Sequence, residues 1–201
     1  METFRFTTFL TSNLDISEAE IDLLLKNCTQ KTVLAGVFLL RQGGYCRHTF
    51  FVERGLLRKY GVDDVKGKES IIQFAPEKWF VADRDSSFFQ QPSQFFIQAM
   101  EDSTVLMLDE VIMEQLNQKI KGFVAFNERL LHNHIRQQTK RIYELLSASA
   151  EERYLSFIAT YPDLLWRVPQ WMIASYLGIT PESLSRIRKE LARRNSPQKD
   201  L

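Results

Sequence analysis

The chain has 201 residues, and 44% of them are hydrophobic, which suffices for one or two domains with a sizeable core. No run of apolar residues approaches the roughly 18 that a membrane span needs. Its start lacks the basic and then apolar layout of a signal peptide, and Cys28 and Cys46 are too few for a disulfide framework or a thiolate metal cluster, which favours a reducing cytoplasm. Residues 1–120 hold 13 Lys and Arg against 17 Asp and Glu, whereas residues 121–201 hold 13 against 8, and the basic excess of the second part suits contact with phosphates.

The first half of the chain predicts one helix followed by short strands. Residues 14–27 are amphipathic, and Ser17 followed by Glu20 forms a capping box at the start of this predicted helix. From about residue 32 to residue 109, short apolar or alternating runs are broken by turns. The predicted strands are 32–40, 48–53, 56–62, 70–74, 95–100 and 104–108. Several short strands at regular spacing indicate a sandwich or a barrel.

Helices follow these strands. A short helix at 110–116 precedes a long helix at about 119–146. The long helix carries an apolar stripe close to a/d spacing, interrupted by Asn127 and Gln138 and made of Ile120, Val124, Leu131, Ile135, Ile142 and Leu145. Such a stripe suits a dimer seam, and it also suits a helix buried against its own roll. Ser149 and Glu152 form a second capping box, which starts a helix that ends before Tyr161.

Residues 168–191 predict two short helices joined by a tight turn. Pro169 suits the first position of the first helix, and Gly178 suits its left-handed end. Thr180 followed by Pro181 predicts the N-cap and first position of the second helix. One face of the second helix is apolar, with Leu184, Ile187 and Leu191, and the other carries Glu182, Ser185, Arg186, Lys189 and Arg193. This pattern is typical of a helix-turn-helix, although a helical hairpin with a solvated second helix would share it.

The whole order of elements resembles the CRP/FNR family of transcription regulators. Residues 39–58 are similar to the opening strands of a cyclic-nucleotide-binding roll, and residues 182–186 lie in the helix-turn-helix. The resemblance implies an α+β fold with a double-stranded β-helix (jelly-roll) sensor domain at 1–118, a long dimerisation helix at 119–146 and a helix-turn-helix domain at 147–201. Family relatives usually carry a two-stranded wing after the second helix, and residues 193–201 are too short and polar to form one.

The resemblance implies a homodimer that reads a palindromic site in double-stranded DNA, with RNA polymerase as a further partner. We expect Arg186 to contact a guanine edge and Glu182 to accept from cytosine N4, or else to stabilise the helix start. The other expected DNA contacts are Ser185, at a base edge or phosphate, and the backbone-holding residues Thr180, Lys189, Arg193 and Arg194. No catalytic triad, phosphate loop or metal-ligand spacing is present, so neither an enzyme nor a cofactor is predicted.

The predicted sensor site lacks the residues that cyclic AMP requires. Family members that bind it carry Gly-Glu, a short helix, and then Arg-Ser or Arg-Thr. The matching stretch, residues 76–95, has no Gly-Glu, and residues 91–94 (Gln-Pro-Ser-Gln) replace the Arg-Ser. Without that arginine a buried phosphate would stay largely unpaired, so cyclic AMP is not the expected effector.

A small effector of another kind is an open alternative. The candidate pocket residues are Trp79, Arg84, Ser93, Gln94, Gln138 and Thr139, the last two falling where relatives let the long helix touch a ligand across the dimer. The region is strongly aromatic, and most of its six aromatic residues are expected in the core; the six are Trp79, Phe80, Phe88, Phe89, Phe95 and Phe96. His48, His132 and His134 are expected to be ordinary surface or interface histidines.

The alternative function, from another class, is a cyclic-nucleotide-type ligand-binding module that regulates a partner protein. The helix-turn-helix would then be only a scaffold. Sequence-specific, salt-dependent DNA binding separates the two functions.

Overall fold

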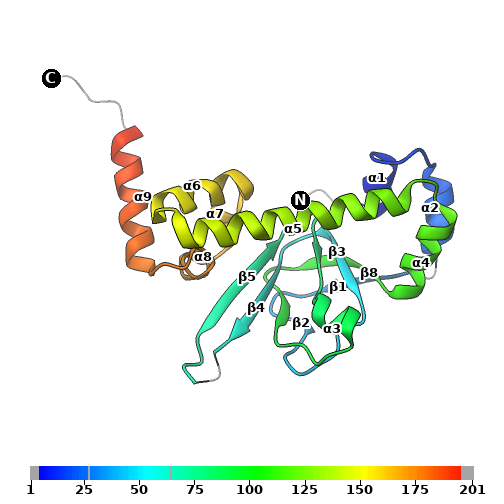
Figure 1. Ribbon diagram of the computed structural model, residues 1–201, viewed down its shortest axis with the longest axis horizontal. Helices are drawn as coiled ribbons and strands as arrows, with labels where there is room; N and C mark the ends of the chain where they lie inside the picture. The colour runs from blue at the N-terminus through cyan, green and yellow to red at the C-terminus, as the bar shows by residue number, and fades with distance from the viewer. Residues whose placement is uncertain (1–4, 27, 64, 196–201) are drawn as a thin grey trace. The chain divides into compact units, whose positions relative to one another are not determined.

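The computed structural model describes residues 5–26, 28–63 and 65–195 (Figure 1). The chain divides into two compact units, residues 1–132 and residues 133–201. The boundary falls inside a long helix, so the division into 1–118, 119–146 and 147–201 stays a prediction. In the described part of the chain, no helix combines the length and apolar composition needed to cross a membrane.

The first unit contains two four-stranded antiparallel sheets. One sheet has the order β1 (Thr29–Val33), β8 (Ser103–Leu108), β3 (Thr49–Arg54) and β6 (Phe80–Val81). The other has the order β2 (Phe38–Leu40), β7 (Phe96–Ala99), β4 (Leu57–Val62) and β5 (Glu69–Ala75). Val33, Val52 and Val105 of the first sheet share one buried cluster with Leu57 and Ile97 of the second, so the two sheets face each other across a common core. The predicted α+β roll is confirmed.

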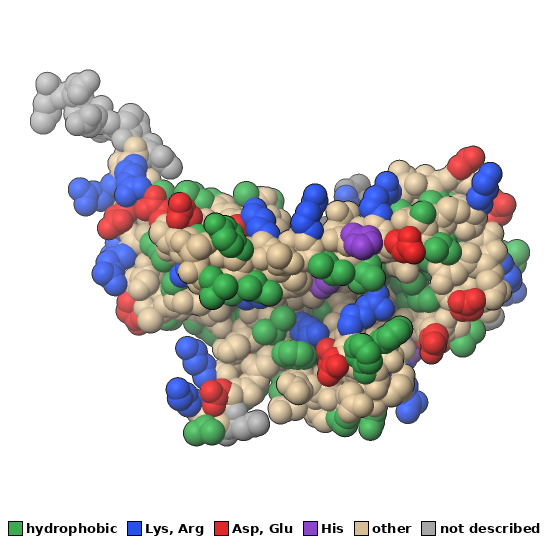
Figure 2. Space-filling model, in the orientation of Figure 1, with side chains coloured by type: hydrophobic (Ala, Val, Ile, Leu, Met, Phe, Trp, Pro, Cys, Tyr) green, Lys and Arg blue, Asp and Glu red, His purple; other side chains and the backbone are tan. Residues whose placement is uncertain are grey.

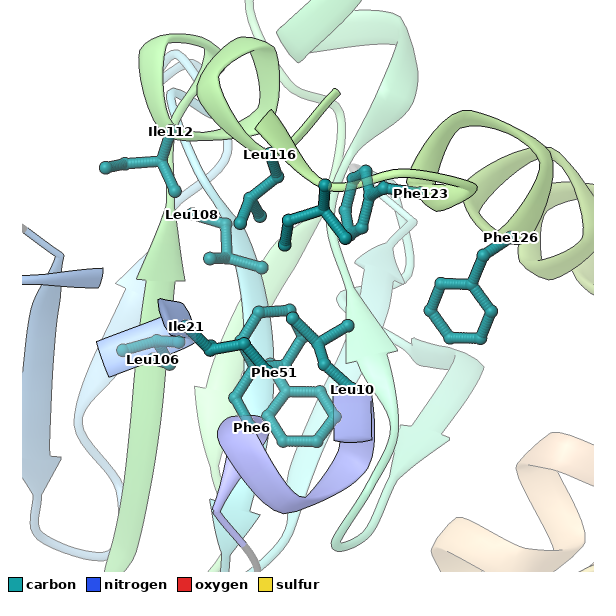
Figure 3. Close-up of a cluster of buried hydrophobic side chains, with 11 residues drawn as sticks. Phe6, Leu10, Ile21, Phe51, Leu106, Leu108, Ile112, Leu116, Phe123 and Phe126 are labelled. Carbon is teal, nitrogen blue, oxygen red and sulfur yellow. The ribbon is translucent and has the colours of Figure 1, made fainter. Parts of the chain in front are cut away.

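Helices cover the outer face of the first sheet. Side chains alternate along a strand, so Phe51 and Leu106 point away from the inter-sheet core that holds Val52 and Val105. They pack against α1 (Phe6–Thr11), α2 (Glu18–Leu25), α4 (Glu110–Lys119) and the start of α5 (Phe123–Ser147). Figure 3 shows these helical side chains and the outward strand side chains gathered in one cluster. The predicted capping box at Ser17 and Glu20 is present at the start of α2.

Several predicted boundaries were wrong, each for a local reason. The single strand predicted at 32–40 is divided into β1 and β2 by a turn in which Gly36 adopts φ +84°. The long helix begins at Phe123 and not at 119, because Gly122 adopts φ +83°, a conformation that a helix does not tolerate. Ile120 therefore lies between two helices and is buried in the core of its own unit, so it is not part of an exposed stripe. Helix α1, strand β6 and the short helices α3 (Arg84–Phe89) and α7 (Leu164–Arg167) were not predicted.

The second unit holds the rest of α5, followed by α6 (Ala150–Thr160), α7, α8 (Gln170–Leu177) and α9 (Pro181–Asn195) (Figure 1). The capping box of Ser149 and Glu152 is present at the start of α6. Two arginines, one from α5 and one from α6, form hydrogen bonds with the end of α8. Arg141 donates to the Tyr176 carbonyl (3.0 Å), and Arg153 donates to the carbonyls of Leu177 (3.0 Å) and Ala148 (2.6 Å). The charge-assisted bonds to Tyr176 and Leu177 satisfy carbonyls that the end of α8 leaves without helical partners, and the bond to Ala148 connects Arg153 to the turn between α5 and α6.

Candidate nucleic-acid interface and roll interior

The turn between α8 and α9 is built by residues that the sequence singled out. Gly178 ends α8 in the left-handed conformation (φ +67°). A Cβ atom at this position would lie 3.1 Å from Leu145 Cδ2, so the glycine also permits close packing against α5. The Ser183 N–H donates to Thr180 Oγ1 (3.2 Å), which confirms Thr180 as the N-cap and Pro181 as the first residue of α9. Pro169 is the N-cap of α8, one position earlier than predicted.

The two faces of α9 differ as predicted. Leu184 and Ile187 are buried and Leu191 is half-buried, which fixes one side of the helix against its unit. Glu182, Arg186, Lys189 and Arg193 are exposed and Ser185 is half-buried, at spacings of three and four residues. Figure 2 shows Lys and Arg side chains along this part of the molecule. The helix therefore offers a mostly basic face that residues 133–195 leave uncovered.

The exposed side chains of α9 differ in their partners. Arg186, Lys189 and Arg193 form no ion pair with any other described residue. Arg194 pairs with Glu151 of α6 (2.6 Å). Hydrogen bonds from its own backbone N–H and from the Thr180 hydroxyl lower the pKa of Glu182. Glu182 therefore already has a local role at the helix start, whereas Arg186 has no such partner.

The residues expected in an effector pocket lie at different depths. Ser93 is buried, Trp79 is half-buried against the inter-sheet core, and Arg84 and Gln94 are exposed. Gln138 is half-buried and Thr139 is exposed, both on the part of α5 that belongs to the second unit. Of the four candidates in the roll, Ser93 is the one that is fully buried, and the grouping of the six residues into one pocket stays a prediction.

Lys59 of β4 and Asp83 supply a polar centre in the roll that the sequence analysis missed. The Lys59 ammonium donates to Asp83 Oδ1 (2.9 Å) and to the Ala82 carbonyl (3.1 Å), and it lies 4.4 Å from the centre of the Phe95 ring. The Ser93 hydroxyl donates to the other carboxylate oxygen, Asp83 Oδ2 (2.7 Å). The sequence did contain a signal for this lysine. Lys59 lies two residues after Leu57 in a predicted strand, and side chains two residues apart point to the same face, so Lys59 falls on the inward face.

Other side chains around this centre also depart from expectation. Phe88 and Phe89, at the end of α3, are 74% and 64% exposed, so the prediction of core positions was wrong for these two. Cys46 is buried beside the centre, and desolvation above all raises the pKa of its thiol.

The three histidines lie at or near the surface. His132 and His134 are exposed and His48 is half-buried. No group of three His, Cys, Asp or Glu side chains among the described residues is placed to hold a metal ion.

Comparisons with known proteins agree with this architecture. Residues 30–119 match the cyclic nucleotide-binding domain family. No curated protein sequence is significantly similar to the chain. The structure of FixK2 from Bradyrhizobium japonicum is similar with a TM-score of 0.68 at 17% identity, over 83% of this chain and 85% of FixK2.

Two further solved structures extend the likeness. A mutant of CooA from Carboxydothermus hydrogenoformans matches with a TM-score of 0.67 at 19% identity, over 85% of this chain and 79% of CooA. A protein from Eubacterium rectale, described as a transcriptional regulator of the CRP/FNR family, matches with a TM-score of 0.63 at 18% identity, over 90% of this chain and 85% of its own. Residues 30–119 are thus similar to the cyclic nucleotide-binding domain family, and the chain as a whole has the fold seen in the CRP/FNR regulators.

Proposed function

We propose that the protein is a homodimeric transcription regulator that reads a palindromic DNA site through α9. The observation that carries this proposal is the exposed face of α9, where Arg186, Lys189 and Arg193 have no ion-pair partner in the described chain. An arginine on such a face can make a bidentate contact with guanine O6 and N7, and its neighbours can neutralise phosphates. The likeness to a protein described as a transcriptional regulator also supports a role without catalysis.

The apolar stripe of α5 supports the dimer. Val124, Leu131, Ile135 and Ile142 are 49%, 42%, 51% and 58% exposed, and their spacings of seven, four and seven residues place them on one face of a helix. A row of large apolar side chains that the described residues leave uncovered indicates a protein partner. A second copy of the same helix is the simplest partner, because a two-fold axis would pair each stripe with itself. Gln138, half-buried on this helix, would set the register.

Some parts of the proposal rest on the resemblance alone. These are RNA polymerase as a partner, a cytoplasmic location and an effector at Gln138 and Thr139. The predicted absence of a wing concerns a tail that falls mostly outside the described residues, since α9 is described to Asn195.

Selection of bound fragments from a random DNA library by the full-length protein tests the proposal. We expect a two-fold symmetric motif whose half-sites lie about 10 bp apart, one for each copy of α9. A matched selection with Arg186→Ala should lose the motif while retaining weak binding to all sequences. If the wild-type protein enriches no motif, α9 is only a scaffold and the alternative function, a ligand-binding module that acts on a partner protein, replaces this one.

A further inference from the structure

The inference concerns the charges inside the roll. The buried cations of the described roll are Arg58 and Lys59, which are neighbours on β4 and therefore point to opposite faces of the sheet. Arg58 lies on the outer face, where it bonds Glu69 and Gln98. Lys59 lies on the inner face with Leu57, which belongs to the inter-sheet core. Lys59 is thus the inward cation of this part of the roll.

The counter-ion of Lys59 comes from the chain itself. Asp83 is 3% exposed and Lys59 is 9% exposed, and the two residues are joined at 2.9 Å. The second carboxylate oxygen accepts from the buried Ser93 hydroxyl, and the Asp83 N–H donates to Cys46 Sγ (3.4 Å). Both carboxylate oxygens of Asp83 and its backbone N–H therefore form hydrogen bonds within the roll, and these bonds fix the carboxylate beside the Lys59 ammonium.

This arrangement bears on the class of ligand that the roll can take. A cyclic nucleotide brings a phosphate anion, and an anion taken out of water needs a cation to balance it. We propose that Asp83 is a built-in anion that neutralises Lys59 and so excludes cyclic nucleotides from this cyclic nucleotide-binding domain. Asp83 is then the specificity-determining residue of the roll. The proposal concerns the roll alone, so its failure would leave the DNA-reading function untouched.

Asp83→Asn in the full chain tests the proposal, because it removes the charge and keeps the shape. The variant leaves the Lys59 ammonium and the Ser93 hydroxyl in place without an anion. We expect inorganic phosphate and cyclic AMP to raise the melting temperature of this variant in a saturable way, by about 5–10 °C at roughly 100 times the dissociation constant. The wild-type protein should show no saturable shift with either probe. A shift with phosphate and cyclic AMP indicates an anion site, and a shift with cyclic AMP alone indicates a site for the whole nucleotide.

Two matched variants give the controls. Asp85→Asn changes an exposed carboxylate two residues away and should behave as the wild type. The double variant Lys59→Met/Asp83→Asn lacks both charges and should respond to neither probe. If Asp83→Asn is recovered only by refolding, its yield in phosphate is compared with its yield in chloride at equal ionic strength, and a higher yield in phosphate is expected. A wild-type protein that is stabilised by cyclic AMP, or an Asp83→Asn variant that gains nothing from either anion in melting or refolding, would overturn the proposal.

Discussion

The roll interior and the exposed face of α9 differ in whether their positively charged side chains are paired within the chain. In the roll, Lys59 is buried and its charge is balanced within the chain by Asp83. On α9, Arg186 and Lys189 are exposed and no described side chain balances them. A charge that is already paired inside a protein resists an external ligand, whereas an exposed and unpaired row of charges attracts one. The comparison indicates that the described chain balances the buried cation of the roll itself and leaves the cations of α9 open to an external anion.

The largest effect is expected where the buried pair is broken. Lys59→Met leaves the Asp83 carboxylate buried without its cation, and we expect a loss of about 3–5 kcal/mol in the free energy of unfolding. Urea denaturation of the full chain measures it. The double variant Lys59→Met/Asp83→Asn should recover most of this loss, because it removes the stranded charge. A loss below about 1 kcal/mol in the single variant would show that the pair is not buried in solution.

The next effect concerns the uncovered stripe of α5. Ile135→Glu places two like charges at a dimer seam, and we expect the dimer dissociation constant to rise by at least about 100-fold. Light scattering during gel filtration measures the mass over a range of concentrations. Asn133→Glu adds the same charge off the stripe and should remain a dimer. If both variants keep the mass of a dimer, the seam lies elsewhere.

A smaller effect separates two kinds of DNA contact on α9. Arg186→Ala should weaken binding to the selected site by about 1–3 kcal/mol and hardly change binding to random DNA. Lys189→Ala should weaken both alike and reduce the slope of log affinity against log salt by about 1. Fluorescence anisotropy at several salt concentrations measures both variants. Equal losses on both DNAs for Arg186→Ala would make it a phosphate contact.

The smallest effect is expected at Glu182, whose charge already has local partners. Its pKa is lowered in the folded protein, so its contribution to stability is present above its unfolded pKa and is lost as the pH falls through the folded value. Glu182→Gln should therefore slightly lower the melting temperature at pH 7 and leave it unchanged at a pH well below the folded pKa of Glu182. Repeating the DNA selection with this variant decides the second role. An altered base preference means that Glu182 reads cytosine, and an unaltered motif limits it to the helix start.

Local signals in the sequence predicted most of the elements, among them the helix pair α8 and α9. The N-cap Thr180, the left-handed Gly178 and the two capping boxes each act within a few residues, so the sequence alone predicts them. Short strands with turn residues between them likewise predicted a β-rich first half. These features, in this order, were sufficient to indicate the fold and the candidate DNA contacts.

Only the tertiary structure decided which side chains are covered and which charges meet. Ile120 shares the spacing of the α5 stripe, yet the turn at Gly122 directs it into the core. Lys59 and Asp83 are 24 residues apart, and they meet because β4 and the segment before α3 come together in the roll. Strand alternation marks Lys59 as an inward position, but its partner depends on a contact between distant segments, and such a contact leaves no periodic or local mark in a single sequence.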